Sequence, residues 1–432
     1  MSALAPFYQR AHKICQVASD DYDPERAVAE LAHPRAKLLP FDPAWLETLI
    51  YRFSPPTRFG HVYREPLRQA ADLRCYLNAN VLAIKTDASA RTVSRLAVGT
   101  LSGARFEVAA KTYVLSAGGV ENARLLLLSN DVIGNGLGNQ HDLVGRYFME
   151  HPHTKRELIV PTRRLASGIY GELFHSRAIM ARMSLPEDRQ RQEKLLNYSA
   201  NLHAVYFAHD SQGWLALRKA VLSMSRSRRS DPFIRLPPYG RKGLSPRQIF
   251  DMLRQFDRTA IAGLLRLFQP NGFISGFVLE SKTEQAPNRD SRISLDDAHD
   301  AFGLRRVKID WRTLPIDRHT TVRGEEIVDA EMRRLGIGSM APLRPGEIEG
   351  WPDNLEGGWH QLGTTRMHAD ASHGVVDSNA RVHGMSNLFI AGGSVFPTGG
   401  SGPPTLTIVA LALRLADHLT QSIFRVGSAS PR

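Results

Sequence analysis

The sequence predicts an α/β fold in which a part with parallel strands and helices is joined to an α+β domain. Three observations support this prediction. Lys111–Ser116 is a short apolar and β-branched run that passes through small residues into an amphipathic helix, Val120–Ser129. Asn387–Ala391 is a second apolar run, followed by a glycine-rich loop and a helix from about Pro404. Between them, Thr154–Pro345 mixes strand and helix patterns, which is typical of a sheet covered by helices on one side.

The amino-terminal part is predicted to hold one helix and a meander of antiparallel strands. Pro6–Val17 has apolar residues at helical spacing. Leu73–Thr86 alternates between apolar and polar residues, and Val93–Val98 and Arg105–Ala109 repeat the pattern on either side of a turn at Leu101–Gly103.

The central span is predicted to contain several strands and three helices. The strands are expected near Glu157–Val160, Leu196–His203, Phe273–Leu279 and Val307–Trp311. The helices are expected near Trp214–Ser225, Pro246–Leu267 and Asp317–Leu335.

Composition excludes several classes of protein. The 432 residues are 42% hydrophobic and 23% charged, which is enough to bury one large core or two ordinary ones. The longest apolar runs, Leu125–Leu128 and Ile408–Leu413, are far shorter than the ~20 residues of a membrane span. Met1–Arg10 has no signal-peptide pattern, which predicts a cytoplasmic location; the periplasm is the alternative if residues precede Met1.

Cysteine content and charge suggest no special chemistry. The two cysteines, Cys15 and Cys75, cannot form a disulfide framework or a four-thiolate zinc site, and we expect both to be buried free thiols. The net charge of +12 is partly concentrated between Arg218 and Arg247. Without a recognition motif, this stretch is expected to be a solvated surface that binds no nucleic acid; contact with a membrane surface or an acidic partner is the alternative.

Two glycine-rich turns are candidate ligand sites. A helix beginning at Pro404 has unpaired N–H groups at its start, which favour negative charge in front of it. Small residues at Ser116–Gly119 allow a nucleotide to approach the end of a strand. No G-x-G-x-x-G occurs in the chain, and its nearest imitation, Gly134–Gly138, has the wrong spacing. The loop before Pro404 is crowded by Gly392, Gly393, Gly399, Gly400 and Gly402.

Among the histidines, His360 is the candidate base. It follows Trp359 and precedes a Gly-Thr-Thr sequence, so a loop presents it, and a neutral imidazole there can accept a hydroxyl proton. His151 and His153 offer two imidazoles to a metal, but no carboxylate or cysteine stands at a ligand spacing, and we predict no metal site.

The carboxyl-terminal residues carry a resemblance to a known family. The segments concerned are W-H-x-x-G-T-T-R-M at Trp359–Met367, V-V-D at Val375–Asp377, R-V-H-G at Arg381–Gly384, N-L-F-I-A-G-G-S-V-F-P-T-G-G-S at Asn387–Ser401 and P-T-L-T-I at Pro404–Ile408, with upstream support from Ala117–Leu127 and Gly138–His153. Together they resemble the glucose–methanol–choline (GMC) flavoprotein oxidoreductases, in the branch of pyranose oxidases and sugar or gluconate dehydrogenases. The resemblance extends over nearly the whole chain, from about Pro6.

This resemblance implies an FAD-binding Rossmann-like domain, incomplete at its amino-terminal side, and a substrate domain whose sheet covers the flavin. It implies oxidation of an alcohol, with His360 as the catalytic base and hydride transfer to flavin N5. The implied domains are residues 1–65 (helical and loop segment), 66–153 (first part of the FAD domain), 154–374 (substrate domain) and 375–425 (last part of the FAD domain). The implied cofactor-binding residues are Val81, Ala117, Gly118, Gly119, Asn122, Gly392, Gly393, Ser394, Pro404, Thr405 and Leu406.

Three departures from the family pattern leave two interpretations open. Pro403 stands where the family has a second catalytic His or Asn, and it offers neither a side-chain partner nor an N–H group. His368 replaces the usual glycine, and the first βαβ unit with its pyrophosphate cradle is absent from the sequence. We therefore expect either a GMC-type enzyme acting on a sugar, polyol or other alcohol, or an impaired remnant or subunit that needs a partner chain to bind FAD.

Overall fold

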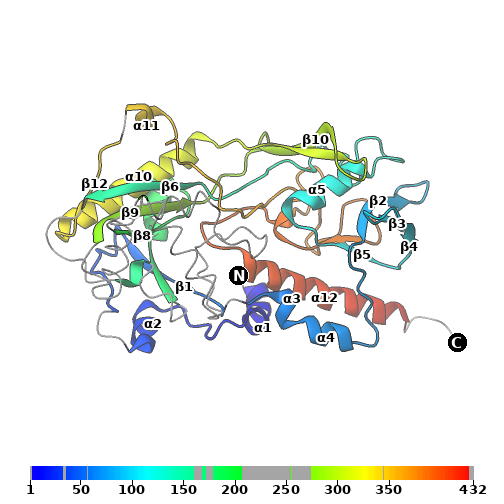
Figure 1. Ribbon diagram of the computed structural model, residues 1–432, viewed down its shortest axis with the longest axis horizontal. Helices are drawn as coiled ribbons and strands as arrows, with labels where there is room; N and C mark the ends of the chain where they lie inside the picture. The colour runs from blue at the N-terminus through cyan, green and yellow to red at the C-terminus, as the bar shows by residue number, and fades with distance from the viewer. Residues whose placement is uncertain are drawn as a thin grey trace.

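The computed structural model describes residues 2–32, 36–55, 57–159, 168–171, 179–206, 254, 274–343 and 345–427. The helices predicted near Trp214–Ser225 and Pro246–Leu267, and the basic stretch from Arg218 to Arg247, lie outside these residues. Figure 1 shows an elongated arrangement, with β6, β8 and β9 toward one end of the long axis and β2, β3 and β4 at the other.

A six-stranded antiparallel sheet forms the first part. Its order is β1-β7-β8-β9-β6-β12, and all five pairings are antiparallel. The strands are β1 (Glu47–Arg52), β6 (His153–Ile159), β7 (Ile179–Ser184), β8 (Tyr198–Tyr206), β9 (Ile274–Thr283) and β12 (Ser339–Met340). The strands predicted near Glu157, Leu196 and Phe273 are confirmed as β6, β8 and β9.

One face of this sheet packs on helices and forms the first core. Helix α10 (Pro315–Arg334) contacts β8 and β9, and α2 (Pro24–Leu31) contacts β1. Because side chains alternate along a strand, every second residue faces these helices. The buried apolar residues here include Ile50, Ala181, Met183, Leu202, Leu279, Ile327, Val328 and Met332. An antiparallel sheet with helices on one side is the α+β domain that the sequence predicts.

The opposite face of the same sheet is polar and nevertheless buried. The register pairs Asn201 with Glu280 and Lys282 with His153, so these side chains share a face, and Arg182 on β7 alternates with the core residues Ala181 and Met183. Arg182 and Asn201 are each 1% exposed. Buried polar groups require partners. We call this surface the polar face of the sheet.

The second part contains two parallel strands, each followed by a glycine turn and a helix. Strand β5 (Tyr113–Leu115) pairs in parallel with β13 (Leu388–Ile390). The turn after β5 leads into α5 (Gly118–Leu128), and β13 is followed by a short 3-10 helix, Gly393–Val395, and then α12 (Thr405–Gly427). The predicted strand, turn and helix patterns are confirmed in both places, and their apolar residues form a second core.

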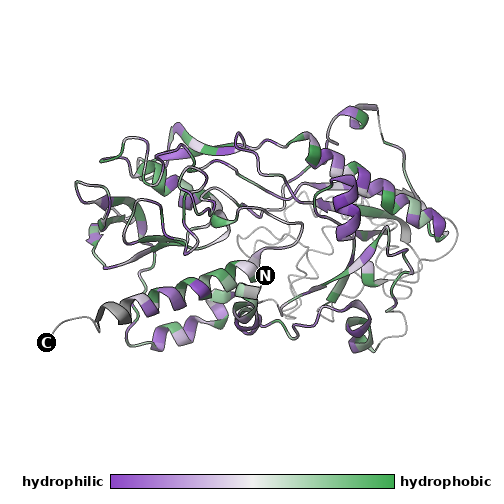
Figure 2. Cartoon of the chain, turned by 180° about the vertical axis from the view of Figure 1, so that it is seen from behind, coloured by the Kyte–Doolittle hydropathy of each residue, from purple (hydrophilic) through white to green (hydrophobic). Residues whose placement is uncertain are grey.

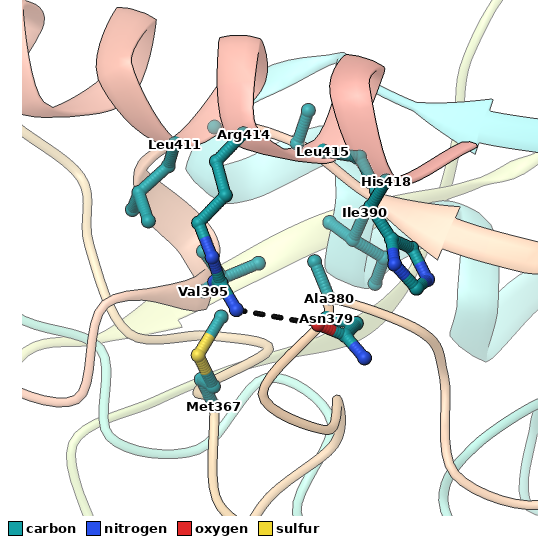
Figure 3. Close-up of a pocket in the computed structure, with 11 residues that line it drawn as sticks. Met367, Asn379, Ala380, Ile390, Val395, Leu411, Arg414, Leu415 and His418 are labelled. Atoms are coloured by element: carbon teal, nitrogen blue, oxygen red, sulfur yellow. Dashed lines mark hydrogen bonds between the residues drawn. The ribbon is translucent and has the colours of Figure 1, made fainter. Parts of the chain in front are cut away.

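Helix α12 is held near β13 by residues close to its middle. Arg414 donates hydrogen bonds from Nη1 to the Ser378 carbonyl oxygen (2.7 Å) and from Nη2 to Asn379 Oδ1 (3.2 Å). Figure 3 shows Arg414 beside a pocket lined mainly by apolar side chains, among them Leu411 and Leu415. The start of α12 is thereby held at a defined place relative to the end of β13. Figure 2 shows hydrophobic and hydrophilic residues along this helix.

The three-stranded meander is confirmed with one correction. Strands β2 (Asn80–Thr86), β3 (Val93–Gly99) and β4 (Arg105–Val108) are antiparallel neighbours. The predicted strand from Leu73 is wrong over its first part, because Asn78 has φ 57° and its turn interrupts the extended backbone before Asn80.

The amino-terminal helix packs beside α12. Helix α1 (Ala5–Cys15) confirms the helix predicted at Pro6–Val17, and Tyr8 Oη lies 2.8 Å from Thr407 Oγ1. Cys15 is buried, as predicted, but Cys75 is exposed. The expectation for Cys75 is wrong because Arg74–Tyr76 belong to an exposed irregular segment before β2.

The remaining elements are short or connect the two parts. They are a 3-10 helix (Ser2–Leu4), α3 (Phe59–Val62), α4 (Arg64–Gln69), a 3-10 helix (Gly168–Tyr170), α6 (Glu187–Glu193), β10 (Arg292–His299), β11 (Arg305–Asp310) and α11 (Pro345–Glu349). Strand β11 and helix α10 confirm the patterns predicted at Val307–Trp311 and Asp317–Leu335. Within the described ranges, none of the helices combines the length and apolar character that crossing a bilayer requires.

Candidate active site

A bulged loop presents His360. The segments Met149–His153 and Glu356–Leu362 run antiparallel, joined by bridges between Met149 and Leu362 and between His153 and Glu356. The second segment has two more residues between the bridges than the first, so it must bulge. Within the bulge, Trp359 has φ 60°, a left-handed conformation that costs energy in a residue with a side chain.

Glu150 holds this bulge in place. Its Oε2 accepts the His360 backbone N–H at 2.8 Å, and its own N–H donates to Gln285 Oε1 at 2.9 Å. Only 7% of Glu150 is exposed. Burial raises the pKa of this carboxyl, while hydrogen bonds from the loop backbone oppose that rise. Glu150 therefore fixes the position of His360, the candidate base.

His151 packs against His360 at the glycine loop. The two rings are 5.0 Å apart between centroids and lie edge to face. His151 Cε1 is 3.9 Å from where a Cβ on Gly399 would lie, and Tyr51 Oη is 3.5 Å from that position on Gly402. The glycine loop thus borders both His151 and Tyr51 on β1.

Both imidazoles are neutral near pH 7. Burial and, as the smaller cause, the charge of Lys282 together lower the pKa of His360 to about 4. Burial, together with the neighbouring His360, lowers the pKa of His151 to about 3. His360 Nδ1 is buried and has no hydrogen-bond partner among the described residues. A neutral imidazole with an unpaired nitrogen can accept a proton from a hydroxyl group.

The loop that carries His360 fits against both glycine turns. A Cβ on Gly119 would lie 2.3 Å from the Gln361 carbonyl oxygen, and one on Gly393 would lie 2.6 Å from Leu362 Cδ2. Asn122 joins the two turns, because its Oδ1 accepts the Ala117 N–H (2.9 Å) and its Nδ2 donates to Ser394 Oγ (3.0 Å). Gly119 and Gly393 are therefore needed for close packing of the loop that carries His360.

The other turn residues leave space for a flat ligand. Gly118 has φ 92° and Gly400 has φ 64°, and a Cβ on either would meet no atom within 4 Å. At the start of α12, Pro404 is buried, Thr405 is exposed and Leu406 is half-buried. The first N–H groups of a helix have no acceptor within it. These open glycines and free donors fit the ring edge of a flavin, which accumulates negative charge on reduction.

Other residues singled out in the sequence belong to other elements. Val81 lies on β2 opposite Val98 and is 37% exposed, and its contact with a cofactor stays a prediction. His368 and His373 pair with each other, 5.1 Å between ring centroids, in another loop. Among the described residues, no group of three histidine, cysteine or carboxylate side chains is arranged to hold a metal ion.

Several site residues carry no signal in the sequence. Glu150 precedes two histidines that suggest only a metal site, and its contact with the His360 backbone depends on the bulge. Arg182 and Lys282 stand on strands more than ninety residues apart, and only the sheet register brings them to one face.

Comparison with known proteins supports the resemblance read from the sequence. Residues 287–412 match the GMC oxidoreductase family. The chain is 26% identical over 359 residues to 2-methyl-1,2-propanediol dehydrogenase of Mycolicibacterium austroafricanum, covering 81% of this chain and 54% of that protein. It is 28% identical over 350 residues to the fructose dehydrogenase large subunit of Gluconobacter japonicus, covering 80% and 54%.

The chain spans about half the length of these curated relatives. Among solved structures, pyridoxine 4-oxidase from Mesorbium loti aligns with a TM-score of 0.49 at 18% identity, covering 82% of this chain and 59% of that one. The GMC family resemblance is confirmed, and with it the predicted combination of strand–turn–helix units and an α+β domain.

Proposed function

We propose that this chain is an FAD-dependent oxidoreductase acting on the CH–OH group of a sugar, a polyol or another alcohol, with His360 as the catalytic base. One observation carries the proposal. A neutral imidazole, with an Nδ1 that has no hydrogen-bond partner among the described residues, packs against His151, and His151 borders the glycine loop that leads into the start of α12. The family match and the names of the relatives, which are dehydrogenases of a diol and of a sugar, support the same chemistry.

In this mechanism the chain's own residues move one proton and hold the reacting groups. His360 takes the hydroxyl proton of the alcohol, while Glu150 fixes the loop that carries the ring. His151 packs against the His360 ring and limits its rotation. Bound FAD would accept a hydride from the carbon that carries this hydroxyl group. The N–H groups of Thr405 and Leu406 would face the edge of the cofactor where negative charge develops.

A second interpretation is that the chain is an impaired enzyme or a subunit. Two observations favour it. Pro403 is exposed and has no donor or acceptor in its side chain, so it cannot share hydroxyl binding with His360. Losing such a partner lowers a rate ~10²-fold or more. In addition, β5 and β13 form only a two-stranded sheet within the described residues, and Val114 on β5 is 42% exposed.

Two parallel strands alone are not a stable sheet, because parallel sheets are normally covered and extended. We infer that further polypeptide, from this gene product or from a partner chain, pairs with the free edge of β5 and completes the FAD site.

A dye-coupled assay distinguishes the two interpretations. The purified chain, loaded with FAD, is assayed over a panel of sugars, polyols and simple alcohols, with and without the products of neighbouring genes. We expect turnover of at least one alcohol and a fall of ~10²-fold or more in His360→Ala. His373→Ala, in a separate exposed loop, is the matched control and should keep full activity. Turnover that survives the His360 substitution would remove this residue from the mechanism.

A further inference from the structure

A cavity lies on the α10 side of the six-stranded sheet, at the edge formed by β6. Its volume is about 360 Å³, and it is lined by residues of β6, of α10 and of the chain that follows β12. Thr154 and Arg156 line it and alternate along β6 with His153, so they point away from the polar face. Thr154 Oγ1 donates to Glu325 Oε1 on α10 at 3.0 Å, in agreement with this direction. The cavity and the candidate active site therefore belong to opposite faces of β6.

The outer wall of the cavity is a strap, residues 341–354 except 344, which polar side chains hold in place. Figure 1 shows α11, within this strap, on the outer side of α10. No residue of α11 is buried. Arg318 Nε on α10 donates to the Gly350 carbonyl oxygen at 2.7 Å, and Trp351 Nε1 donates to Thr313 Oγ1 at 3.1 Å. The strap is thus fixed over a space that its own side chains do not fill.

The cavity has the size and the access of a small-molecule site. Ligand pockets usually have volumes of ~300–1,000 Å³, and about 360 Å³ is near the lower limit. Pro342, Asp353 and Asn354 line the cavity and are exposed, so one side of it opens to solvent. A small ligand can therefore reach and fill this space.

The charges on this side of the sheet nearly balance. The lining residues here include two cations, Arg156 and Arg318, and three acidic residues, Glu325, Glu347 and Asp353. Arg156 and Glu325 already pair with each other at 3.1 Å. Burial raises the pKa of Glu325, which reduces the excess of negative charge. An anion would meet more carboxylates than cations, and a cation would meet only a small negative excess, so neither gains much from this lining.

The lining combines hydrogen-bonding groups with apolar surface. Val322 on α10 and Leu343 and Trp351 on the strap are half-buried and line the cavity. A wholly apolar ligand would remove water from the guanidinium and carboxylate groups without replacing their hydrogen bonds. A molecule with hydroxyl groups at its edges and C–H groups on its faces satisfies both parts of the lining, because hydroxyl groups donate and accept and C–H groups pack on an aromatic ring.

We propose that this cavity binds a neutral monosaccharide, at a site separate from His360. The hydroxyl groups of the sugar bond to the charged side chains of α10 and the strap, and one face of its ring packs on Trp351. The strap continues into Glu356, whose backbone bonds to that of His153, and then into the loop that carries His360. Binding in the cavity does not depend on the proposed function, because no group of the candidate active site contacts this ligand.

Calorimetric titration of the full chain, with FAD present and no electron acceptor, tests this binding. The probes are glucose, glucosamine and glucose 6-phosphate, which share a ring and differ in charge. We expect glucose to bind more tightly than either charged sugar. Val322→Phe fills the cavity from α10, and Leu343→Phe fills it from the strap. Each should weaken glucose binding ~10-fold or more, because the added ring clashes with the sugar.

Two variants and one further measurement serve as controls. His319 is exposed on α10 and does not line the cavity, so His319→Phe adds the same ring to this helix outside the site. Neither His319→Phe nor His360→Ala should lower the affinity that the two filling variants remove. Without ligand, the filling variants should melt at the native temperature or higher, since the added ring occupies empty space.

Four results would overturn the inference. Glucose binding that survives both filling variants, or that is lost only in His360→Ala, places the sugar elsewhere. Tighter binding of a charged sugar, or no binding of glucose, contradicts a site for a neutral ring. A filling variant that melts well below the native chain shows that the space is not empty as described. If glucose binds in the cavity and no alcohol is oxidised, the inference stands and the proposed function fails.

Discussion

At the scale of single residues, the chemistry depends on keeping one imidazole neutral. Burial removes hydration from the charged form of His360. The positive charge of Lys282 also disfavours a second positive charge on this imidazole. A solvated histidine has a pKa of ~6.5, whereas here burial and Lys282 lower it to about 4. The base is therefore ready to accept a proton over a wider pH range than a solvated histidine.

This environment predicts a particular pH dependence. The rate constant kcat/KM should fall on the acid side only as the pH approaches about 4, because protonation of His360 removes the base. In Lys282→Met the loss of a positive neighbour favours the protonated imidazole, so the acid limb should move to higher pH. Profiles of kcat/KM against pH for both chains make the comparison.

The control for this profile is Lys111→Met, because Lys111 is exposed and lies two residues before the start of β5. It should leave the acid limb in place. An acid limb near pH 6.5 in the native chain, or one that does not move in Lys282→Met, would show that His360 is not the titrating base.

Only some residues of the candidate site could be predicted from the sequence. His360 was identified because Trp359 and the following Gly-Thr-Thr place it in a loop. Glu150, His151 and Arg182 reach the site through a bulge and through strand register, and neither is visible in a sequence read one segment at a time. Assignments of individual cofactor contacts, such as Val81 and Leu406, remain predictions.

At the scale of elements, the two strand–turn–helix units were predictable and the outer strands were not. β5 and β13 are short apolar runs that end in glycine turns, so the pattern is local. β1 and β7 were missed. In β7 only Ala181–Ser184 alternate between apolar and polar residues, and four residues are too short a pattern to predict a strand.

The contact between the glycine turn and the catalytic loop gives an element-scale prediction. In Gly119→Ala the new methyl group would collide with the Gln361 backbone, which cannot rotate away. We expect a loss of about 1–3 kcal/mol in the free energy of unfolding, typical of overpacking, and a lower kcat because His360 is displaced. Chemical denaturation and steady-state kinetics measure the two effects.

Gly60→Ala is the matched control. Gly60 lies in α3 with nothing within 4 Å of the added methyl group, so this variant should be as stable as the native chain or slightly more stable. If Gly119→Ala behaves like Gly60→Ala, the turn and the catalytic loop are not packed as described.

At the scale of the whole molecule, the candidate site lies where the two parts of the structure contact each other. The six-stranded sheet contributes a buried polar face, and the two parallel strands contribute glycine turns and the start of α12. The chain passes between these parts through the loop with Glu150, between α5 and β6, and through the loop with His360, between α11 and β13. The sequence predicted both parts as separate classes of structure, but the domain boundaries at 65, 153 and 374 remain predictions.

The most direct measurement is reduction of bound flavin under anaerobic conditions. The full chain is loaded with FAD, with its completing polypeptide if one is required, and mixed with the alcohol that gives the fastest turnover. We expect the visible flavin absorbance to bleach in a single turnover in the native chain, and at least ~10²-fold more slowly in His360→Ala. Bleaching at the same rate in both chains, or none with any alcohol despite bound FAD, would contradict alcohol oxidation by this imidazole.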